Sequence, residues 1–303
     1  MFRMAEDKNF NNGEKIGIKK IVEGSGEEAR IIEIPIFVKW AGGKYQLLEQ
    51  YKPLFPKTVT RYFEPFIGGG AVFFYANQKY EPTEIYLSDT NKDLINVYTQ
   101  IRDNVEVLVE LLKEHKAKHS KEYYYEARNS FNKEIDILKR TAYLIYLNRT
   151  CFNGLYRVNS KGEFNVPFGK YDNPAIIRQH TLEKVNKILQ GVDIRVQDFE
   201  AIGEQVREGD FIYFDPPYHP LNHTSSFTSY TETGFTEADQ TRLATLFKIL
   251  DEKGCKVMLS NSDTELIRNL YTDYDIRTVM ARRVISCKGE GRGAISELVV
   301  RNY

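Results

Sequence analysis

The stretch that decides the fold is Phe211-Ile212-Tyr213-Phe214-Asp215-Pro216-Pro217-Tyr218. Its apolar first half has the length and composition of a buried strand. The prolines carry no N–H and fix extended φ angles, so the strand ends at Asp215. Open α/β sheets bind ligands at the carboxyl ends of their strands. The Asp215 carboxylate and the Pro216 carbonyl are therefore predicted to accept hydrogen bonds from an exocyclic amino group, while Tyr218 stacks on the ring that carries it. Taken alone, the stretch also fits a proline-stopped strand followed by an ordinary surface loop.

A second strand, at Tyr62–Glu64, leads into a glycine run at Gly68–Gly70 and then into an apolar helix. This is the order of a nucleotide-binding βα turn, in which glycine lets a ligand approach the backbone. About twenty residues later the strand Glu84–Asp89 ends in an acid, a spacing that lets Asp89 accept both hydroxyls of a ribose. The glycines do not complete the dinucleotide fingerprint, so the pattern predicts a nucleoside-type cofactor without a pyrophosphate.

Two weaker signals accompany this pattern. A glycine pair at 42–43 and Lys44 precede a helical pattern at Tyr45–Tyr51, so backbone N–H groups there would receive a carboxylate or a phosphate. The spacing is not that of a P-loop. The strand at Val192–Phe199 has an acid near its end, as the other two strands do.

The middle of the chain has a different character. Helical stretches at Val105–Lys116, Lys121–Asn132, Ile135–Leu147 and Leu182–Leu189 flank one irregular segment, Asn148–Tyr171, which interleaves cations, amides and aromatic rings. Arginine can form two hydrogen bonds with guanine, asparagine can form two with adenine, and a bulky side chain can insert between stacked bases. Residues 111–190 hold fifteen Lys or Arg against eight Asp or Glu, which suits a phosphate backbone. An ordinary β-hairpin on a basic, solvated helical surface is the alternative.

The last third is predicted to complete the sheet. A long polar loop at His219–Gly234 has the length of an active-site lid. Thr236 is placed to cap a helix that runs to Lys253. Strands follow at Lys256–Ser260, Ile276–Ile285 and Ile295–Asn302, and the last two predict a terminal hairpin around the bend at Gly289–Gly293.

The bulk composition narrows the class of protein. The chain has 303 residues, a formal net charge of zero, and no apolar run long enough to span a membrane. The polar N-terminus lacks a signal-peptide core, and the three cysteines are isolated, which fits a reducing, cytoplasmic or nucleoid-associated protein. Neither the cysteines nor the five histidines have the spacing of metal ligands, so we expect no metal site.

Together these segments resemble the Dam-type (D12 class, alpha-group) family of DNA adenine-N6 methyltransferases, from about Phe37 to Tyr303. The most specific parts are Trp40–Lys44, Glu64-Pro65-Phe66 with its glycine run, Arg149–Gly169 and Asp215–Tyr218. The resemblance implies a Rossmann-like class I sheet that binds S-adenosyl-methionine (SAM), with an inserted, mainly helical target-recognition domain. The implied catalytic domain covers residues 32–104 and 192–303, the insertion covers 105–191, and residues 1–31 form a leader of unknown role.

The resemblance also implies the site residues. The catalytic motif is Asp215, Pro216, Pro217 and Tyr218. The cofactor would contact Trp40, Gly42, Lys44, Glu64, Phe66, Gly68, Gly70, Asp89, Asn91, Asp198, Phe199 and Asp215. DNA would contact Lys39, Arg149, Phe152, Asn153, Leu155, Arg157, Lys170 and Arg292. Because Lys39 and Leu155–Arg157 match positions that the family uses to read its site, the implied target is adenine in GATC. The expected partner is double-stranded DNA, the expected state is a monomer, and a cognate restriction endonuclease stays an open partner.

Two other classes of function are weighed against this one. Methylation of cytosine N4 or of an RNA base is disfavoured, because Ser rather than Asp commonly opens the motif in the cytosine enzymes. A non-catalytic nucleic-acid-binding homologue is disfavoured because the acidic set Asp89, Asp198 and Asp215 is intact.

Overall fold

The computed structural model describes residues 17–24, 29–221, 234–282 and 294–303, which form two compact units. The described residues of the first unit fall within Met1–Ala41, Asn96–Tyr156 and Val166–Gln190. Those of the second unit fall within Gly42–Ile95, Arg157–Asn165 and Gly191–Tyr303. These bounds follow compactness, so the expected division by function at residues 105 and 191 stays a prediction.

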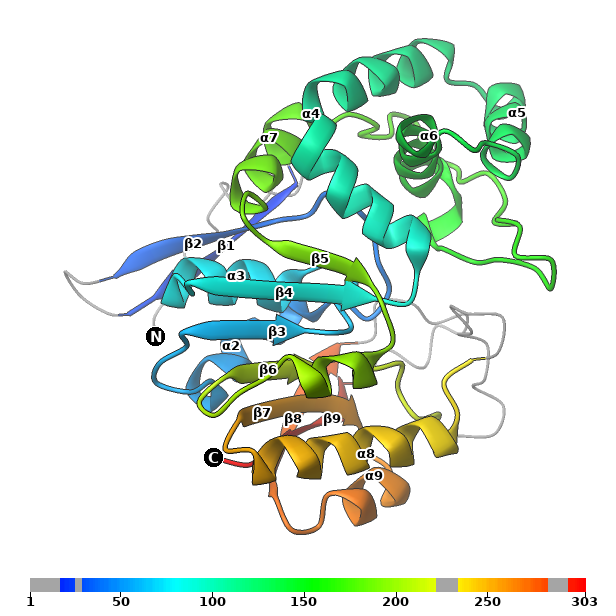
Figure 1. The fold of residues 1–303 in the computed structure, drawn as a ribbon. Coiled ribbons are helices and arrows are strands. Elements are labelled where there is room, and N and C mark those ends of the chain that lie inside the picture. The colour runs from blue at the N-terminus through cyan, green and yellow to red at the C-terminus, as the bar shows by residue number, and fades with distance from the viewer. Residues whose placement is uncertain (1–16, 25–28, 222–233, 283–293) are drawn as a thin grey trace, which may run out of the picture. The chain divides into compact units, whose positions relative to one another are not determined.

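The second unit is built on a seven-stranded sheet (Figure 1), which confirms the predicted α/β fold. Its order is β5-β4-β3-β6-β7-β9-β8, and the first five strands in this order run parallel. The parallel strands are β3 (Arg61–Glu64), β4 (Glu84–Asp89), β5 (Asp193–Val196), β6 (Phe211–Phe214) and β7 (Lys256–Ser262). The antiparallel pair β8 (Asp275–Arg282) and β9 (Ala294–Arg301) completes the sheet and confirms the predicted terminal hairpin.

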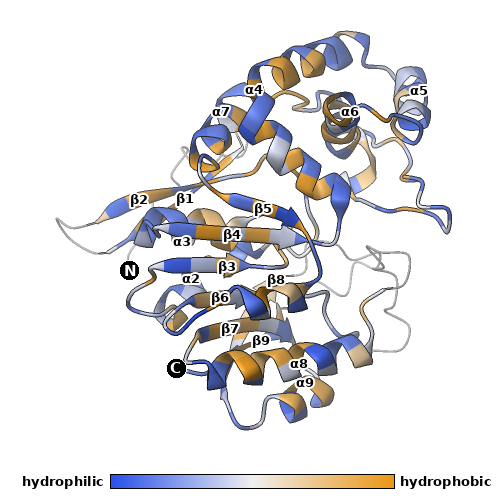
Figure 2. Ribbon diagram, viewed as in Figure 1, coloured by the Kyte–Doolittle hydropathy of each residue, from blue (hydrophilic) through white to orange (hydrophobic). Residues whose placement is uncertain are grey.

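Helices cover both faces of this sheet, which explains why β6 is apolar at every position. On one face, Ile212 and Phe214 share a buried cluster with Leu243 and Phe247 of α8 (Glu237–Glu252). On the other face, the Tyr213 ring lies 6.3 Å from that of Tyr51 in α2 (Leu48–Tyr51). Figure 2 shows the apolar residues along β7 and on α8.

Local signals set the ends of the helices. The predicted cap of α8 is confirmed, because Thr236 and Asp239 form a reciprocal capping box. Gly70 is the N-cap of α3 (Ala71–Tyr80) and has a φ of 71°, a left-handed angle that glycine adopts without strain. The short helix α9 (Glu265–Leu270) was not predicted, although Thr264 caps it in the usual way.

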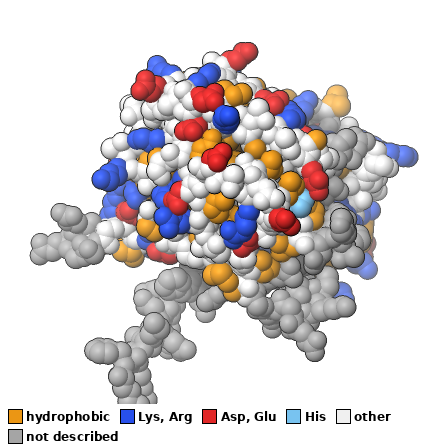
Figure 3. Space-filling model, turned by 90° about the horizontal axis from the view of Figure 1, so that it is seen from below, with side chains coloured by type: hydrophobic (Ala, Val, Ile, Leu, Met, Phe, Trp, Pro, Cys, Tyr) orange, Lys and Arg blue, Asp and Glu red, His pale blue; other side chains and the backbone are white. Residues whose placement is uncertain are grey.

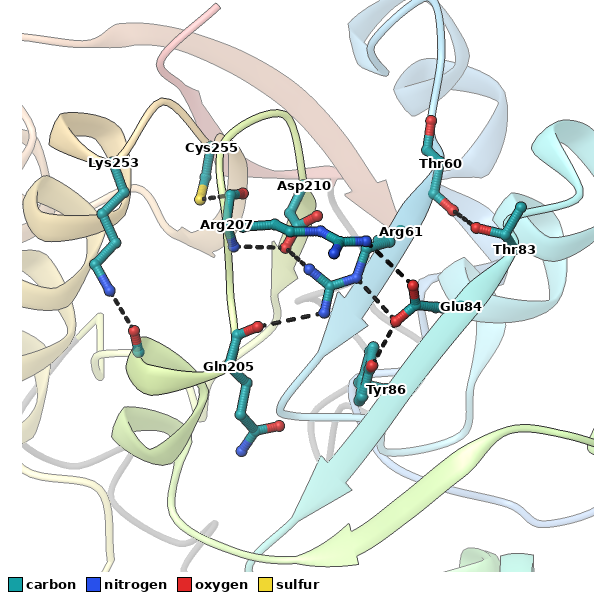
Figure 4. Close-up of polar contacts among 11 residues, drawn as sticks. Thr60, Arg61, Thr83, Glu84, Tyr86, Gln205, Arg207, Asp210, Lys253 and Cys255 are labelled. Carbon is teal, nitrogen blue, oxygen red and sulfur yellow. Dashed lines mark hydrogen bonds and ion pairs between the residues drawn. The ribbon is translucent and has the colours of Figure 1, made fainter.

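The amino ends of the central strands are joined by one polar network (Figure 4). Arg61, the first residue of β3, donates to Asp210 at 2.6 Å and to Glu84 at 3.1 Å. The Arg61 and Asp210 side chains are only 7% and 4% exposed, so loss of Arg61 would remove the charged hydrogen-bond partner of the buried Asp210 carboxylate. This network lies at the opposite strand ends from Asp215 and leaves the carboxyl ends to build the site.

The first unit is mainly helical, as predicted for the middle of the chain. It contains part of α4 (Lys92–Lys118), which kinks at Asn104, together with α5 (Lys121–Phe131), α6 (Ile137–Thr150) and α7 (Gln179–Ile188). It also contains the antiparallel pair β1 (Ile18–Glu23) and β2 (Arg30–Pro35). Helix α6 continues three residues beyond the predicted end, since Asn148, Arg149 and Thr150 are buried within it.

Several sequence features lie outside the described residues, namely Arg292, the bend Gly289–Gly293, most of the predicted lid and the first half of the leader. No helix in the described parts is long and apolar enough to cross a membrane. No cluster of His, Cys, Asp or Glu suited to a metal ion occurs among the residues that the structure describes. On the face seen in Figure 3, basic and acidic side chains are interspersed, in keeping with the zero net charge.

Candidate active site

Asp215, the carboxylate that the sequence predicts to be catalytic, lies at the carboxyl end of β6. Phe214 pairs with Leu259 of β7, which brings the next residues, Asp215 and Ser260, to the same end of the sheet. The Ser260 hydroxyl donates to Asp215 Oδ1 at 2.8 Å, and Ser260 Oγ also lies 2.9 Å from the Tyr213 hydroxyl. The Asp215 side chain is 18% exposed, so it is oriented by the sheet yet open to a ligand.

Lys44 supplies the cation of this site. Its Nζ lies 2.7 Å from Asp215 Oδ1 and 2.8 Å from Oδ2, and it donates to the Gly42 carbonyl at 2.6 Å. The ammonium also lies 4.7 Å from the centre of the Tyr218 ring. A nitrogen donor of the chain therefore occupies the position in which the sequence predicted an amine, against Asp215 and near Tyr218. Lys44 was predicted to contact the cofactor, which stays a prediction, and its ammonium contacts Asp215 of the Asp-Pro-Pro-Tyr motif.

Tyr218 is held at the far end of its ring. Its hydroxyl donates to Glu297 Oε2 of β9 at 2.7 Å. Burial raises the pKa of Glu297, and the positive charge of Lys44 opposes this rise. Gln240 of α8 donates to the Pro217 carbonyl at 3.0 Å. Glu297 was not predicted as a site residue, although it is the only acid in its strand, which was the signal available in the sequence.

A second group of predicted residues meets at the ends of β3 and β4. Gly68 and Gly70 have φ angles of 47° and 71°, so the glycine turn adopts a conformation that other residues rarely adopt. Asp89 Oδ1 accepts from the Asn91 N–H at 2.9 Å, and its Oδ2 accepts from the Gly68 N–H at 3.4 Å. Burial raises the pKa of Asp89 to about 6. An acid next to a glycine turn at strand ends has the arrangement that fits a ribose, so the prediction of a nucleoside-type cofactor is retained.

Glu64, at the end of β3, is buried more deeply than Asp89. It is 2% exposed and accepts a hydrogen bond from the Tyr62 hydroxyl at 2.6 Å. Burial raises its pKa well above the usual range, and the charge of Asp215 raises it further. The buried Glu64 carboxyl therefore favours the protonated form, which can donate a hydrogen bond as well as accept one.

Two other predicted cofactor residues are engaged within the protein. The Asp198 carboxylate caps η5 (Phe199–Glu204) and pairs with Arg242 at 3.1 Å. The Phe199 ring is 2% exposed, stacks on Phe66 at 5.4 Å and has the Arg242 guanidinium 4.9 Å from its centre. In this arrangement Phe199 presents little surface to a ligand. Of this aromatic pair, Phe66 is the more exposed member.

In the first unit, the predicted DNA residues differ sharply in exposure. Arg149 is 4% exposed, and its guanidinium donates to the carbonyls of Ile36 and Phe37 at 2.8 and 2.7 Å. This placement corrects the expectation of a DNA contact, because a buried guanidinium bonded to backbone carbonyls holds the chain together instead. Lys39 is partly buried, and its ammonium lies 4.4 Å from the centre of the Tyr171 ring. Burial lowers the pKa of Lys39.

A tight approach of two chain segments surrounds Lys39. The Asn148 side chain accepts from the Lys39 N–H at 2.8 Å and donates to the carbonyls of Lys39 and Gly154 at 2.8 and 3.0 Å. Gly154 has a φ of 63°, and a Cβ placed there would lie 2.2 Å from Lys39 Cδ. Both the left-handed φ angle and the close approach of the Lys39 side chain therefore favour glycine at position 154.

The remaining predicted DNA residues follow α6. Phe152 is 50% exposed, Asn153 and Lys170 are exposed, and Leu155 is half-buried. The Phe152 ring is therefore not part of the core. Trp40, predicted to contact the cofactor, also belongs to the first unit, where its ring lies 5.3 Å from that of Tyr156.

Arg157 belongs to the short hairpin Arg157–Asn165 of the second unit. Its guanidinium is exposed and donates to Asn165 Oδ1 at 2.7 Å and to the Asn165 carbonyl at 3.3 Å. The hairpin is closed by Asn159, whose side chain accepts from the N–H groups of Lys161 and Glu163. The Arg157 guanidinium is thus oriented by Asn165, which lies opposite it in the hairpin.

The fold and the chemistry of the site define a class of protein before any relative is considered. A mostly parallel α/β sheet whose central strand ends in Asp-Pro-Pro-Tyr is that of a class I methyltransferase. A sequence model described as D12 class N6 adenine-specific DNA methyltransferase matches residues 40–285. The chain therefore belongs to this family.

Named relatives agree with this assignment. The "Type II methyltransferase M.MjaIII" of Methanocaldococcus jannaschii is 46% identical over 289 residues, which cover 90% of this chain and 100% of that protein. The "Type II methyltransferase M1.LlaDCHI" of Lactococcus lactis subsp. cremoris is 45% identical, with 90% and 96% covered. The "DNA adenine methylase" of Escherichia coli (strain K12) is 36% identical, with 87% and 93% covered.

Proposed function

We propose that this protein is a site-specific DNA methyltransferase that transfers a methyl group from SAM to N6 of an adenine flipped out of duplex DNA, within the sequence GATC. The observation that carries the proposal is the arrangement of Lys44, Asp215 and Tyr218. A nitrogen donor of the chain already lies against the carboxylate and 4.7 Å from the ring centre. An adenine offers the same pairing, with an amino group to donate and a flat ring to stack.

The chemistry of the acceptor amine explains why the motif needs these groups. The adenine amino nitrogen is a poor nucleophile, because its lone pair is delocalised into the ring. Hydrogen bonds from the amine to Asp215 and to the Pro216 carbonyl would draw its protons out of the ring plane and localise the lone pair. Stacking on Tyr218 would contribute roughly 1–3 kcal/mol. Asp215 would also stabilise the positive charge that develops on the amine, an electrostatic effect that is strong in a partly buried site.

The residues that would hold the cofactor are those around the glycine turn. Asp89 would accept the ribose hydroxyls, and the turn at Gly68 and Gly70 would let the nucleoside approach the backbone. When bound, SAM supplies a methyl group activated by its sulfonium. The chain's own contribution is to orient the amine and to exclude water from it.

Target recognition is proposed for the segment around α6 and the following hairpin. The target adenine must leave the duplex to reach Asp215, which costs a few kcal/mol of unstacking. Phe152, exposed beside Gly154, is suited to fill the space that the base leaves. Arg157 is exposed, and its guanidinium, which is bonded to Asn165, carries the kind of donors that pair with guanine. GATC is proposed because Lys39 and Leu155–Arg157 match the family's reading positions.

Labelled methyl transfer tests the proposal directly. The protein is incubated with radioactive SAM and, in parallel, a GATC duplex, single-base variants of that duplex, a duplex whose only methylatable bases are cytosines, and RNA. We expect label in N6-methyladenine of the GATC duplex and a loss of at least about tenfold for single-base variants. Label in cytosine or in RNA would establish another amine as the target. Tight DNA binding without label would identify a binding module instead.

A further inference from the structure

We propose that Glu297 is a positioning residue for the methyl-transfer reaction, because it fixes the ring of Tyr218 through the tyrosine hydroxyl. The inference rests on the proposed function, in which the Tyr218 ring stacks on the target adenine. Glu297 lies on β9, 79 residues after Tyr218, and in the described part of the chain its hydrogen bond with the motif is the one from this hydroxyl.

The backbone of Glu297 is held on both sides. It pairs with Ser262 of β7 and with Val279 of β8, so its Cα position is set by two antiparallel ladders. From this fixed position its carboxylate accepts the Tyr218 hydroxyl at 2.7 Å, the length of a strong O–H···O bond. Tyr218, in contrast, belongs to the segment that follows two prolines, whose backbone makes no ladder. The contact therefore ties a ring on an irregular segment to a rigid part of the sheet.

The geometry of tyrosine determines what this contact controls. The phenol oxygen lies on the long axis of the ring, so holding the oxygen fixes where the far end of the ring lies. A stacking surface must have a fixed position to orient its partner, and a displacement of about 1 Å can cost about a hundredfold in rate. Glu297 would thus act on the adenine through Tyr218 and without touching it.

The charges around Glu297 favour a lasting hydrogen bond. Burial and the negative charge of Asp215 raise the pKa of the Tyr218 hydroxyl well above its usual value, so Tyr218 remains a donor. Burial raises the pKa of Glu297, while Lys44 provides the nearby positive charge that favours its ionised form. An ionised acceptor makes a hydrogen bond roughly twice as strong as a neutral one.

A double-mutant cycle on the full chain tests this inference. The proteins are the wild type, Glu297→Ala, Tyr218→Phe and the double variant, with Glu297→Gln as the conservative replacement that keeps a carbonyl acceptor. Glu265→Ala, an exposed glutamate in the first turn of α9, is the matched control. Three quantities are measured: the single-turnover rate of methyl transfer, the SAM dissociation constant, and the fluorescence of 2-aminopurine at the target position, which stacking quenches.

We expect Glu297→Ala and Tyr218→Phe each to slow methyl transfer by about tenfold, since both remove the same charged hydrogen bond. The double variant should be no slower than either single variant, because the two losses are one interaction. Glu297→Gln should recover the rate to within about threefold of the wild type. SAM affinity should stay within about twofold in all variants, and 2-aminopurine should be brighter in the three variants that lose the bond.

Three results would overturn the inference: a wild-type rate in Glu297→Ala, additive losses in the double variant, or weaker SAM binding that matches the loss in rate. If Glu297→Ala does not fold, Tyr218→Phe and Glu297→Gln still test the inference. If this bond holds the ring, Tyr218→Phe should be slow and Glu297→Gln should be close to the wild type. Failure of the wild type to methylate adenine would refute the proposed function itself and is read separately from these ratios.

Discussion

The carboxyl ends of the sheet and the irregular segment after α6 hold their polar side chains in different ways. At the sheet, Asp215 is bonded to Lys44 and Ser260, and Tyr218 is bonded to Glu297. After α6, the side chains of Phe152, Asn153 and Lys170 are exposed. Arg149, in the last turn of α6 itself, is buried and bonded to two backbone carbonyls.

This difference follows from what each region has to do. A group that stabilises developing charge gains most when it is already oriented, so reaction residues are fixed by neighbouring strands. A group that reads a base edge must reach a surface outside the protein, so it is expected to be exposed in the absence of DNA. On the proposed function, the oriented side chains at the sheet would carry out the reaction and the exposed side chains after α6 would recognise DNA. The following predictions test this division.

The largest effect is expected at the sheet. Asp215→Ala should abolish methyl transfer, with a loss of at least about a thousandfold, because the amine loses its charged acceptor. SAM affinity should stay within about tenfold, as Asp215 acts on the target amine. Single-turnover rates and equilibrium SAM binding are measured on the same preparation, with Asp215→Asn as the variant of equal size. A parallel loss of SAM binding and activity would assign this carboxylate to the cofactor site. It would contradict the separate roles proposed for Asp215 and Asp89.

Asp89→Ala should have the converse effect. Loss of hydrogen bonds from the ribose hydroxyls to a charged group should raise the SAM dissociation constant by about 1.5–3 kcal/mol in free energy. The rate at saturating SAM should change much less than in Asp215→Ala. The pair of variants is compared by calorimetric SAM binding and by rates at saturating cofactor. An unchanged SAM affinity in Asp89→Ala would contradict the proposal that Asp89 binds the ribose hydroxyls.

How much of this could be predicted from the sequence depends on the range of the interactions. The strands around Asp89 and Asp215 were predictable because apolar runs that stop at Gly, Pro or an acid are local signals. The partners of these acids were not predictable, since Ser260 and Glu297 come from distant strands and only the strand register brings them to the site. Arg149 was misassigned for the same reason: nothing in its neighbourhood shows that the carbonyls of Ile36 and Phe37 surround its guanidinium.

An intermediate effect is expected in the turn after α6. Gly154→Ala places a side chain at a φ of 63° and within 2.2 Å of Lys39 Cδ, so both the turn and Lys39 must shift. We expect a loss of about 2 kcal/mol in the free energy of unfolding, from the left-handed angle and the crowding together. Gly162→Ala is the matched control, because Gly162 has a φ of 73° with nothing within 4 Å of the added Cβ. Denaturant titrations of the two variants separate the angle from the contact, and equal losses would show that Lys39 gives way without cost.

The smallest effect is expected at Arg157, and it is a change in preference more than in rate. Asn165 already orients the guanidinium, so a guanine can receive its fork with little further ordering. Arg157→Ala should therefore lose about tenfold in discrimination at one base pair, at the low end of what a bidentate contact provides. Methylation rates are measured on single-base variants of one duplex at several salt concentrations.

Lys161→Ala is the matched control for Arg157→Ala, because Lys161 is an exposed cation in the same hairpin. A contact to phosphate alone weakens all sequences alike and lowers the slope of log affinity against log salt by about one unit. We expect Arg157→Ala to change the ranking of the duplexes and Lys161→Ala to leave that ranking intact. If Arg157→Ala instead gives a uniform drop across the panel, its guanidinium contacts the backbone, and exposure after α6 would then mark phosphate binding instead of base recognition.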